Sequence, residues 1–271
     1  MAPASSTTPG ARWRAPMIHA SARFDVILLS HLHGDHIGDK HQPSPNAGTC
    51  GEPALSVKAA PNTNTINIAL AKNATIVTGS EMRSFLGTKL AALGGDAKKS
   101  QLAQFGSSRA FGGVKITTVP AVHSNGVNPA FIEGDLGKML KAAGLAGYAG
   151  PPTGYVLTFS NGLVVYLSGD TGITAEQDSV VRRHYKARLV VMNIGDVFTT
   201  GPTEAAFVIN ELVKPASVIV SHANEVTTKG GKVIAGTKTE IFINATSVPV
   251  HIPLSGVTME FDGNGKCVAG C

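Results

Sequence analysis

The sequence lacks features of membrane proteins and of nucleic-acid-binding proteins. No apolar run approaches the roughly 18 residues needed to span a bilayer, and Arg12 and Arg14 are not followed by the apolar core of a signal peptide. Charged residues make up only 15% of the 271 residues, and the net charge of +5 is not concentrated in a long basic surface or arm. We therefore expect no membrane or nucleic-acid partner, and the sequence does not indicate a cellular location.

Cysteine is also scarce. The three residues Cys50, Cys267 and Cys271 are too few for a disulfide framework. Cys267 and Cys271 have no further His or Cys close by in the sequence, so the pair does not predict a zinc site. Free thiols are the expected state, with one disulfide as the alternative for an exported protein. The Gly-x-Ser-x-Gly motif of serine hydrolases is absent as well.

The most informative segment that is present is His31-Leu-His-Gly-Asp-His36, which directly follows an apolar run at 24–30 that predicts a buried strand. Imidazole and carboxylate groups together suit Zn, Mn or Fe rather than Ca or Mg. A polar loop that happens to be rich in His is the alternative. Because similar residues recur downstream in matching settings, a metal site is the stronger prediction.

Three more candidate ligands each follow an apolar run. His123 follows residues 115–122, Asp170 follows residues 162–168, and His222 follows residues 216–221. In a layered α/β protein the residues just beyond the strand ends gather on one rim. Taken singly, either His would be interpreted as a buried core residue. Taken together, the seven ligands are too many for one tetrahedral ion but fit two ions that share a carboxylate and a water, as in metal-dependent hydrolysis.

The order of these motifs resembles the metallo-β-lactamase fold hydrolases. The segment 193–206 and the late His222 further resemble the branch that contains ascorbate-6-phosphate lactonase and many metal-dependent hydrolases. The resemblance runs from about Phe24 to Phe261. It implies an α/β protein with a four-layer αβ/βα sandwich, in which the first N-terminal strands of the family pattern are shortened or missing.

The resemblance also assigns ligand roles. It implies two divalent transition metal ions per chain, with zinc as the first expectation and manganese or iron as the alternatives. Asp35 and Asp170 would be catalytic, and Gly34 and Gly38 would allow a tight turn around the ions. The metal ligands fall into three groups, namely His31, His33 and His123 for the first ion, Asp35, His36 and His222 for the second, and Asp170 as the bridge.

The spacing of the ligands along the chain predicts one domain over residues 23–271, preceded by an irregular arm at 1–22. An uncovered sheet edge left by the shortened first strands would favour a homodimer, with the arm or the edge near 24–30 in the contact. The alternative is that the arm covers its own sheet.

Several elements are expected from local patterns. An Asn-Gly hairpin at 155–167 is predicted. A helix capped at 79–81 and running over 82–93, and a second helix over 203–213, are predicted by their apolar spacing. Strands are expected at 113–119, 250–252 and 256–261.

The amphipathic segment 134–147 either walls a substrate pocket or simply covers the sheet. Relatives commonly carry His-Tyr where this chain has Ser221-His-Ala-Asn224. The candidate pocket residues are Phe131, Met139, Tyr148, Phe198 and Asn224.

These observations predict a hydrolase that uses a metal-bridged hydroxide on an ester or lactone bond of a small-molecule substrate, with lactonase as the first expectation. Phosphodiesterase or β-lactamase activity at the same dinuclear site is the alternative within enzymes. A metal-binding protein without turnover is the alternative outside them.

Overall fold

The computed structural model describes residues 24–37, 63–254 and 257–271. These residues form two compact units. The seven-stranded unit comprises 105–123 and the described part of 153–271, and the three-stranded unit comprises 24–37, 63–104 and 124–152. The expected arm at 1–22, Gly38 and Cys50 lie outside the described residues, and the expectation of one domain over 23–271 stays a prediction.

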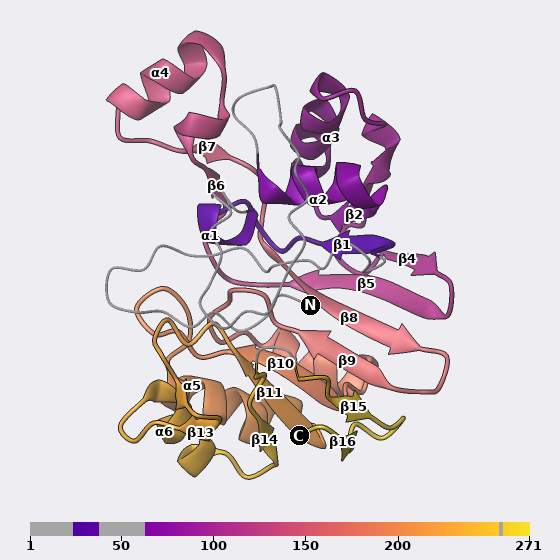
Figure 1. Cartoon of the computed structure of the whole chain (residues 1–271), viewed down its shortest axis with the longest axis vertical. Helices are drawn as coiled ribbons and strands as arrows, with labels where there is room; N and C mark the ends of the chain where they lie inside the picture. Colours follow the sequence, from indigo (N-terminus) through magenta and orange to yellow (C-terminus); the bar gives the residue numbers. More distant parts are fainter. Residues whose placement is uncertain (1–23, 38–62, 255–256) are drawn as a thin grey trace. The chain divides into compact units, whose positions relative to one another are not determined.

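The seven-stranded unit contains one mixed sheet with the strand order β14-β11-β10-β9-β8-β5-β4, which can be followed in Figure 1. The strands from β9 to β14 are parallel, and β4, β5, β8 and β9 form an antiparallel meander. The bounds are β4 (Ser108–Phe111), β5 (Val114–Pro120), β8 (Thr153–Phe159), β9 (Val164–Leu167), β10 (Leu189–Asn193), β11 (Ser217–Ser221) and β14 (Val250–His251).

The predicted Asn-Gly hairpin is confirmed between β8 and β9. Gly162 adopts φ +88°, a conformation that few residues other than glycine tolerate. The side-chain oxygen of Asn161 accepts a hydrogen bond of 3.0 Å from the backbone of Leu163. The turn residues therefore set the register that places β9 and the segment after it.

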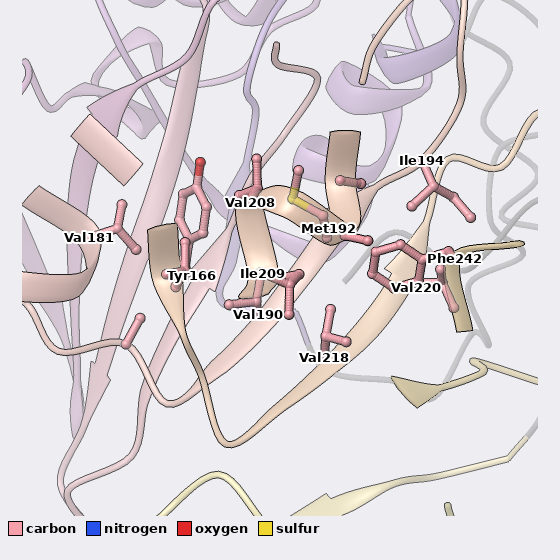
Figure 2. Close-up of a cluster of buried hydrophobic side chains, with 14 of the residues drawn as sticks. Tyr166, Val181, Val190, Met192, Ile194, Val208, Ile209, Val218, Val220 and Phe242 are labelled. Atoms are coloured by element: carbon pink, nitrogen blue, oxygen red, sulfur yellow. The ribbon is translucent and has the colours of Figure 1, made fainter. Parts of the chain in front are cut away.

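Alternation along the strands divides the apolar residues between the two faces of this sheet. One face packs Tyr166, Val190, Met192, Val218 and Val220 against helical segments, as Figure 2 shows. The predicted helix over 203–213 is confirmed, although it begins as an α-helix and continues as a π-helix. The segments are η3 (Gln177–His184), α5 (Pro202–Phe207), η4 (Val208–Val213) and α6 (Lys238–Ala245).

The opposite face carries a second apolar cluster, in which Leu163, Leu189 and Ile219 contact Met259 and Phe261. Phe261 belongs to the antiparallel pair β15 (Glu260–Phe261) and β16 (Cys267–Ala269). The predicted closing strands are therefore present but shorter than expected. A second short pair is formed by β12 (Thr228–Lys229) and β13 (Lys232–Val233).

The expectation of free thiols is wrong for Cys267 and Cys271, which form a disulfide. The chain bends back after β16 at Gly270, whose φ is +75°, and this brings the two Cα atoms to 6.4 Å. That separation lies within the range that a disulfide requires. The bend depends on a backbone conformation that spacing alone does not predict.

The three-stranded unit contains a parallel sheet of order β1-β2-β3. Its core joins Leu29 and Leu32, which follow the first strand, to Ile66, Leu86 and Phe131. The elements are β1 (Val26–Leu28), β2 (Thr75–Thr78), β3 (Ser100–Leu102), α1 (Gly34–Ile37), α2 (Asn64–Lys72), α3 (Met82–Ala92), η1 (Ala97–Lys99), β6 (Gly126–Val127), η2 (Pro129–Phe131), α4 (Gly134–Ala142) and β7 (Gly147–Tyr148).

The predicted helix over 82–93 is confirmed as α3, but its expected cap is wrong. Glu81 occupies the N-cap position with helical dihedral angles and makes no side-chain capping bond. Its carboxylate instead accepts a hydrogen bond from the hydroxyl of the neighbouring Ser80. None of the helices in the described ranges is long and apolar enough to cross a membrane.

Candidate functional site

Four candidate ligands of the three-stranded unit lie together just beyond β1. The ring centroid of His31 is 4.5 Å from that of His33 and 4.1 Å from that of His36. The carboxylate oxygen Oδ2 of Asp35 is 3.3 Å from Nε2 of His36. These four residues, His31, His33, Asp35 and His36, are called the His31 cluster below.

Local structure explains this arrangement. The single turn α1 begins directly after His33, whose carbonyl oxygen accepts hydrogen bonds of 3.0 Å from the backbone N–H groups of His36 and Ile37. Leu32 and Ile37 are fully buried in the apolar core and fix both ends of the segment. The turn does not depend on Gly34, because a Cβ atom there would meet nothing within 4 Å. The packing of the described residues therefore does not require glycine at position 34, and its expected role around the ions stays a prediction.

Asn125 supports the His31 cluster and was missed by the sequence analysis. Its side-chain oxygen accepts a hydrogen bond of 2.8 Å from the backbone N–H of Leu32, and its amide donates to the carbonyl oxygens of Ala149 and Gly150. The hydroxyl of the preceding residue, Ser124, lies 3.3 Å from Nε2 of His33. The only sequence signal was that this polar pair directly follows a candidate ligand.

The other three candidate ligands lie together in the seven-stranded unit, just past the ends of β5, β9 and β11. Nε2 of His222 is 3.2 Å from Oδ2 of Asp170, and Nε2 of His123 is 3.8 Å from the same oxygen. Asp170 is buried, and a buried carboxylate is stable only with cations or hydrogen-bond donors around it. His123, Asp170 and His222 are called the Asp170 cluster below.

Asn193, at the end of β10, ties the loops of the Asp170 cluster together. Its amide donates to the backbone oxygen of Thr171 at 3.1 Å and to the hydroxyl of Thr200 at 2.7 Å, and its side-chain oxygen accepts from Ser168. The hydroxyl of Thr171 in turn accepts a hydrogen bond of 2.9 Å from the backbone of Val122, next to His123. This buried network links the segments that carry His123 and Asp170.

The loop that carries His222 adopts an unusual backbone conformation. His222 and Asn224 have φ values of +51° and +58°, which non-glycine residues rarely adopt. The ammonium group of Lys238, at the start of α6, donates to the backbone oxygens of Gly195 at 2.9 Å and Ala223 at 3.0 Å. Lys238 therefore fastens this loop to the end of β10, a role with no signal in the sequence.

The candidate pocket residues lie in different settings. Phe131 is part of the apolar core of the three-stranded unit, whereas Met139 and Tyr148 of the same unit are 68% and 78% exposed. Phe198 is an exposed residue of the seven-stranded unit, and Asn224 lies in the His222 loop with its amide 3.5 Å from the oxygen of Gly195. The substrate pocket stays a prediction.

Comparison with known proteins identifies relatives. Residues 7–223 match the Beta-lactamase superfamily domain. The chain is 30% identical over 212 residues to a "UPF0173 metal-dependent hydrolase" of Pelotomaculum thermopropionicum, covering 77% of this chain and 72% of the relative. It is 28% identical over 215 residues to a protein of the same name from Cupriavidus metallidurans, covering 76% of this chain and 59% of that relative. The chain thus spans about three fifths of the length of some relatives.

Solved structures show the same fold. Igni18, a metallo hydrolase from Ignicoccus hospitalis, superposes with a TM-score of 0.52 at 18% identity, covering 90% of this chain and 78% of that one. The metallo-β-lactamase fold protein YhfI of Bacillus subtilis gives a TM-score of 0.50 at 15% identity, covering 86% and 76%. The expected fold class is confirmed. The chain belongs to the beta-lactamase superfamily, has the metallo-β-lactamase fold, and falls among the UPF0173 metal-dependent hydrolases.

Proposed function

We propose that this chain is a metal-dependent hydrolase in which the His31 cluster and the Asp170 cluster bind the same two transition metal ions. His31, His33 and His123 would hold one ion, and Asp35, His36 and His222 would hold the other. Asp170 would contact both. Family membership supports this assignment, and so does the grouping of the ligands at strand ends within each unit.

The Asp170 cluster provides the observation that carries the proposal. Two ligand atoms at about 2.1 Å from one tetrahedral ion lie about 3.4 Å apart. The separations of 3.2 Å and 3.8 Å between Oδ2 of Asp170 and the two imidazole nitrogens lie on either side of that value. Imidazole and carboxylate are ligands that zinc, manganese and iron accept. The residues therefore fit a bridging carboxylate with one His on each ion.

When bound, a pair of such ions makes hydroxide available at neutral pH and polarises the oxygen of the substrate. The chain's own residues would position the ligands and handle protons. The Asp170 carboxylate can accept a proton and pass it to the leaving group. The Asn193 network holds the residues on both sides of Asp170 and the residue before His123, while Lys238 holds the turn at His222.

We further propose a cyclic or simple ester as the substrate, with a lactone first. The candidate pocket residues are mostly apolar, which suits an acyl group better than a nucleotide. The two exposed apolar residues Met139 and Tyr148 of the three-stranded unit support this choice.

A substrate panel on metal-loaded protein tests the proposal. Lactones, simple esters, β-lactams and phosphodiesters would be compared on the wild type, on Asp170→Asn, and on protein stripped of metal. Turnover of a lactone that is lost in both controls is the expected result. Preference for a phosphodiester or a β-lactam would overturn the substrate class, and metal binding without any turnover would indicate a binding protein.

A further inference from the structure

A third group of metal-binding side chains lies in the seven-stranded unit, and it shares no residue with the two clusters above. His251 lies on the edge strand β14, and Cys267 begins β16 of the terminal hairpin. One ligand atom each of His251, Cys267 and Cys271 all lie within 4.8 Å of one another. His251 and Cys267 therefore lie close together although 15 residues stand between them in the sequence.

Phe261 holds His251 and Cys267 close to each other. Its ring contacts the ring of His251 edge-on, with 5.3 Å between the centroids, and its backbone pairs with Cys267 in the β15–β16 ladder. Phe261 also packs on the apolar cluster of the sheet. The position of the cysteine pair next to His251 is thus set by the core, not by a mobile tail. No His or Cys lies close to the two cysteines in the sequence, but His251 lies close to them in space. The sequence-based reason against a zinc site at Cys267 and Cys271 is therefore wrong.

His251 has the character of a ligand residue. Within the part of the chain that the structure describes, its Nε2 atom is buried and has no hydrogen-bond partner. A buried polar atom without a partner is costly, and coordination to an ion would remove that cost. Burial also lowers the pKa of His251, which favours the neutral ring that binds metals.

The sulfur atoms are bonded to each other in this structure, and a disulfide is a poor ligand compared with thiolate. The bridge closes a loop with a sequence separation of only 4, and short loops constrain the unfolded chain least. Cys271 is exposed, and Val268 beside Cys267 is 63% exposed, so a dithiol reductant can reach the bond. That reductant would give up two electrons and two protons, become a disulfide itself, and leave two thiols.

We propose that reduced Cys267 and Cys271, together with His251, bind one soft transition metal ion such as zinc. The two thiols lose their protons on binding, and the neutral imidazole supplies the third ligand. Hydrogen peroxide reverses the change: it takes two electrons from the two thiolate sulfur atoms and two protons from the solvent, is reduced to two water molecules, and the ion leaves as the disulfide forms. The site is therefore a redox-controlled metal site, independent of the proposed hydrolytic centre.

Distances and ligand chemistry support this assignment. Zinc binds sulfur at about 2.3 Å and nitrogen at about 2.0–2.1 Å, so two sulfur ligands are at most about 4.6 Å apart. The ligand atoms of the three residues lie within 4.8 Å of one another while the two sulfur atoms are bonded, and reduction would let the sulfur atoms separate around an ion. The backbone oxygen of Ala269 lies 3.3 Å from the sulfur of Cys267 and 3.7 Å from that of Cys271. Its partial negative charge disfavours two bare thiolates, and a cation between them would offset this.

Cobalt(II) is the probe that separates this site from the other ligands, because only sulfur ligands give cobalt an intense near-ultraviolet charge-transfer band. The full chain would be reduced with dithiothreitol, freed of it under nitrogen, and titrated with Co²⁺. We expect the band in reduced protein, its loss after peroxide, and none in the disulfide form. No band in the reduced wild type would overturn the proposal.

Variants assign the ligands. Cys267→Ser and Cys271→Ser should lose the charge-transfer band. His251→Gln should weaken Co²⁺ binding at least about tenfold. The control Cys50→Ser should keep both the band and the affinity for Co²⁺. A band that survives in Cys267→Ser would overturn the site, and unchanged affinity in His251→Gln would remove His251 from it. Alkylation of the reduced wild type needs no variant: Zn²⁺ should block Cys267 and Cys271 but not Cys50, and unprotected cysteines at 267 and 271 would contradict the proposal.

Discussion

Gly195 lies so close to His222 that a side chain on Gly195 would collide with it. A Cβ atom at this position would come within 2.7 Å of the backbone oxygen of His222 and 2.8 Å of its Nδ1. Real Cβ atoms essentially never approach other atoms this closely. Because Lys238 also binds the oxygen of Gly195, the His222 loop has little room to withdraw. Glycine at this position is therefore part of what places the candidate ligand His222.

We expect Gly195→Ala to displace His222 and to lower the rate of hydrolysis about 10²-fold, as a misplacement of about 1 Å does in other enzymes. The steric strain should also lower the free energy of unfolding by about 1–3 kcal/mol. Gly34→Ala is the matched control, because a Cβ there meets nothing within 4 Å. Steady-state kinetics and urea unfolding of both variants measure these effects. Equal rates in the two variants would show that the close approach has no functional role.

Asn193→Ala should destabilise the protein and lower activity together. The change removes one buried amide that bonds to Ser168, Thr171 and Thr200, and each partner left unsatisfied costs about 1–3 kcal/mol. Asn210→Ala is the control, because its bonds to Ala245 and Ser247 are exposed and should contribute about 1 kcal/mol or less. Urea unfolding measures both losses, and a loss no larger for Asn193 than for Asn210 would contradict the proposed role of the network.

Asp35→Ala and His36→Ala should each lower hydrolysis by several orders of magnitude while most of the fold is kept, because each removes a proposed ligand of the proposed second ion. Asp135→Ala serves as the control, because it makes the same Asp-to-Ala change in the same unit at an exposed side chain. Among the ion pairs of the described residues, Asp135 pairs only with Lys138. Steady-state kinetics measure the loss of activity, and circular dichroism shows whether the fold is kept. Retention of more than about a tenth of the wild-type rate would mean that the second ion is not required.

Patterns in the sequence predicted the parts of the fold that depend on local chemistry. The turn at Asn161 and Gly162 and the helix beginning at Pro202 follow from the preferences of those residues, and both are confirmed. The grouping of His123, Asp170 and His222 followed from their positions after apolar runs, since strand ends of one sheet meet at one edge.

Contacts between distant segments could not be predicted in the same way. Asn125, Asn193 and Lys238 support candidate ligands through bonds to backbone atoms, and any polar residue type can make such bonds. The disulfide of Cys267 required the bend at Gly270. The capping role expected of residues 79–81 was wrong because Ser80 and Glu81 bond to each other.

A homodimer is also expected. Among the described strands, β1 lies at one edge of the three-stranded sheet, and an open edge favours pairing with a second copy. Light scattering at micromolar concentration should give about twice the chain mass of 27.9 kDa. A single species at 27.9 kDa would leave the dimer without support and would favour an edge covered within the chain.

The most direct test of the central claim is elemental analysis of purified protein in its disulfide form, with activity assayed on the same sample. The disulfide removes Cys267 and Cys271 as ligands, so among the metal-binding groups of the described residues the count reports the His31 and Asp170 clusters. Active protein should hold about two transition metal ions per chain, and the Asp170→Ala variant should hold fewer and be inactive. Full activity in protein that holds no metal would contradict the central claim.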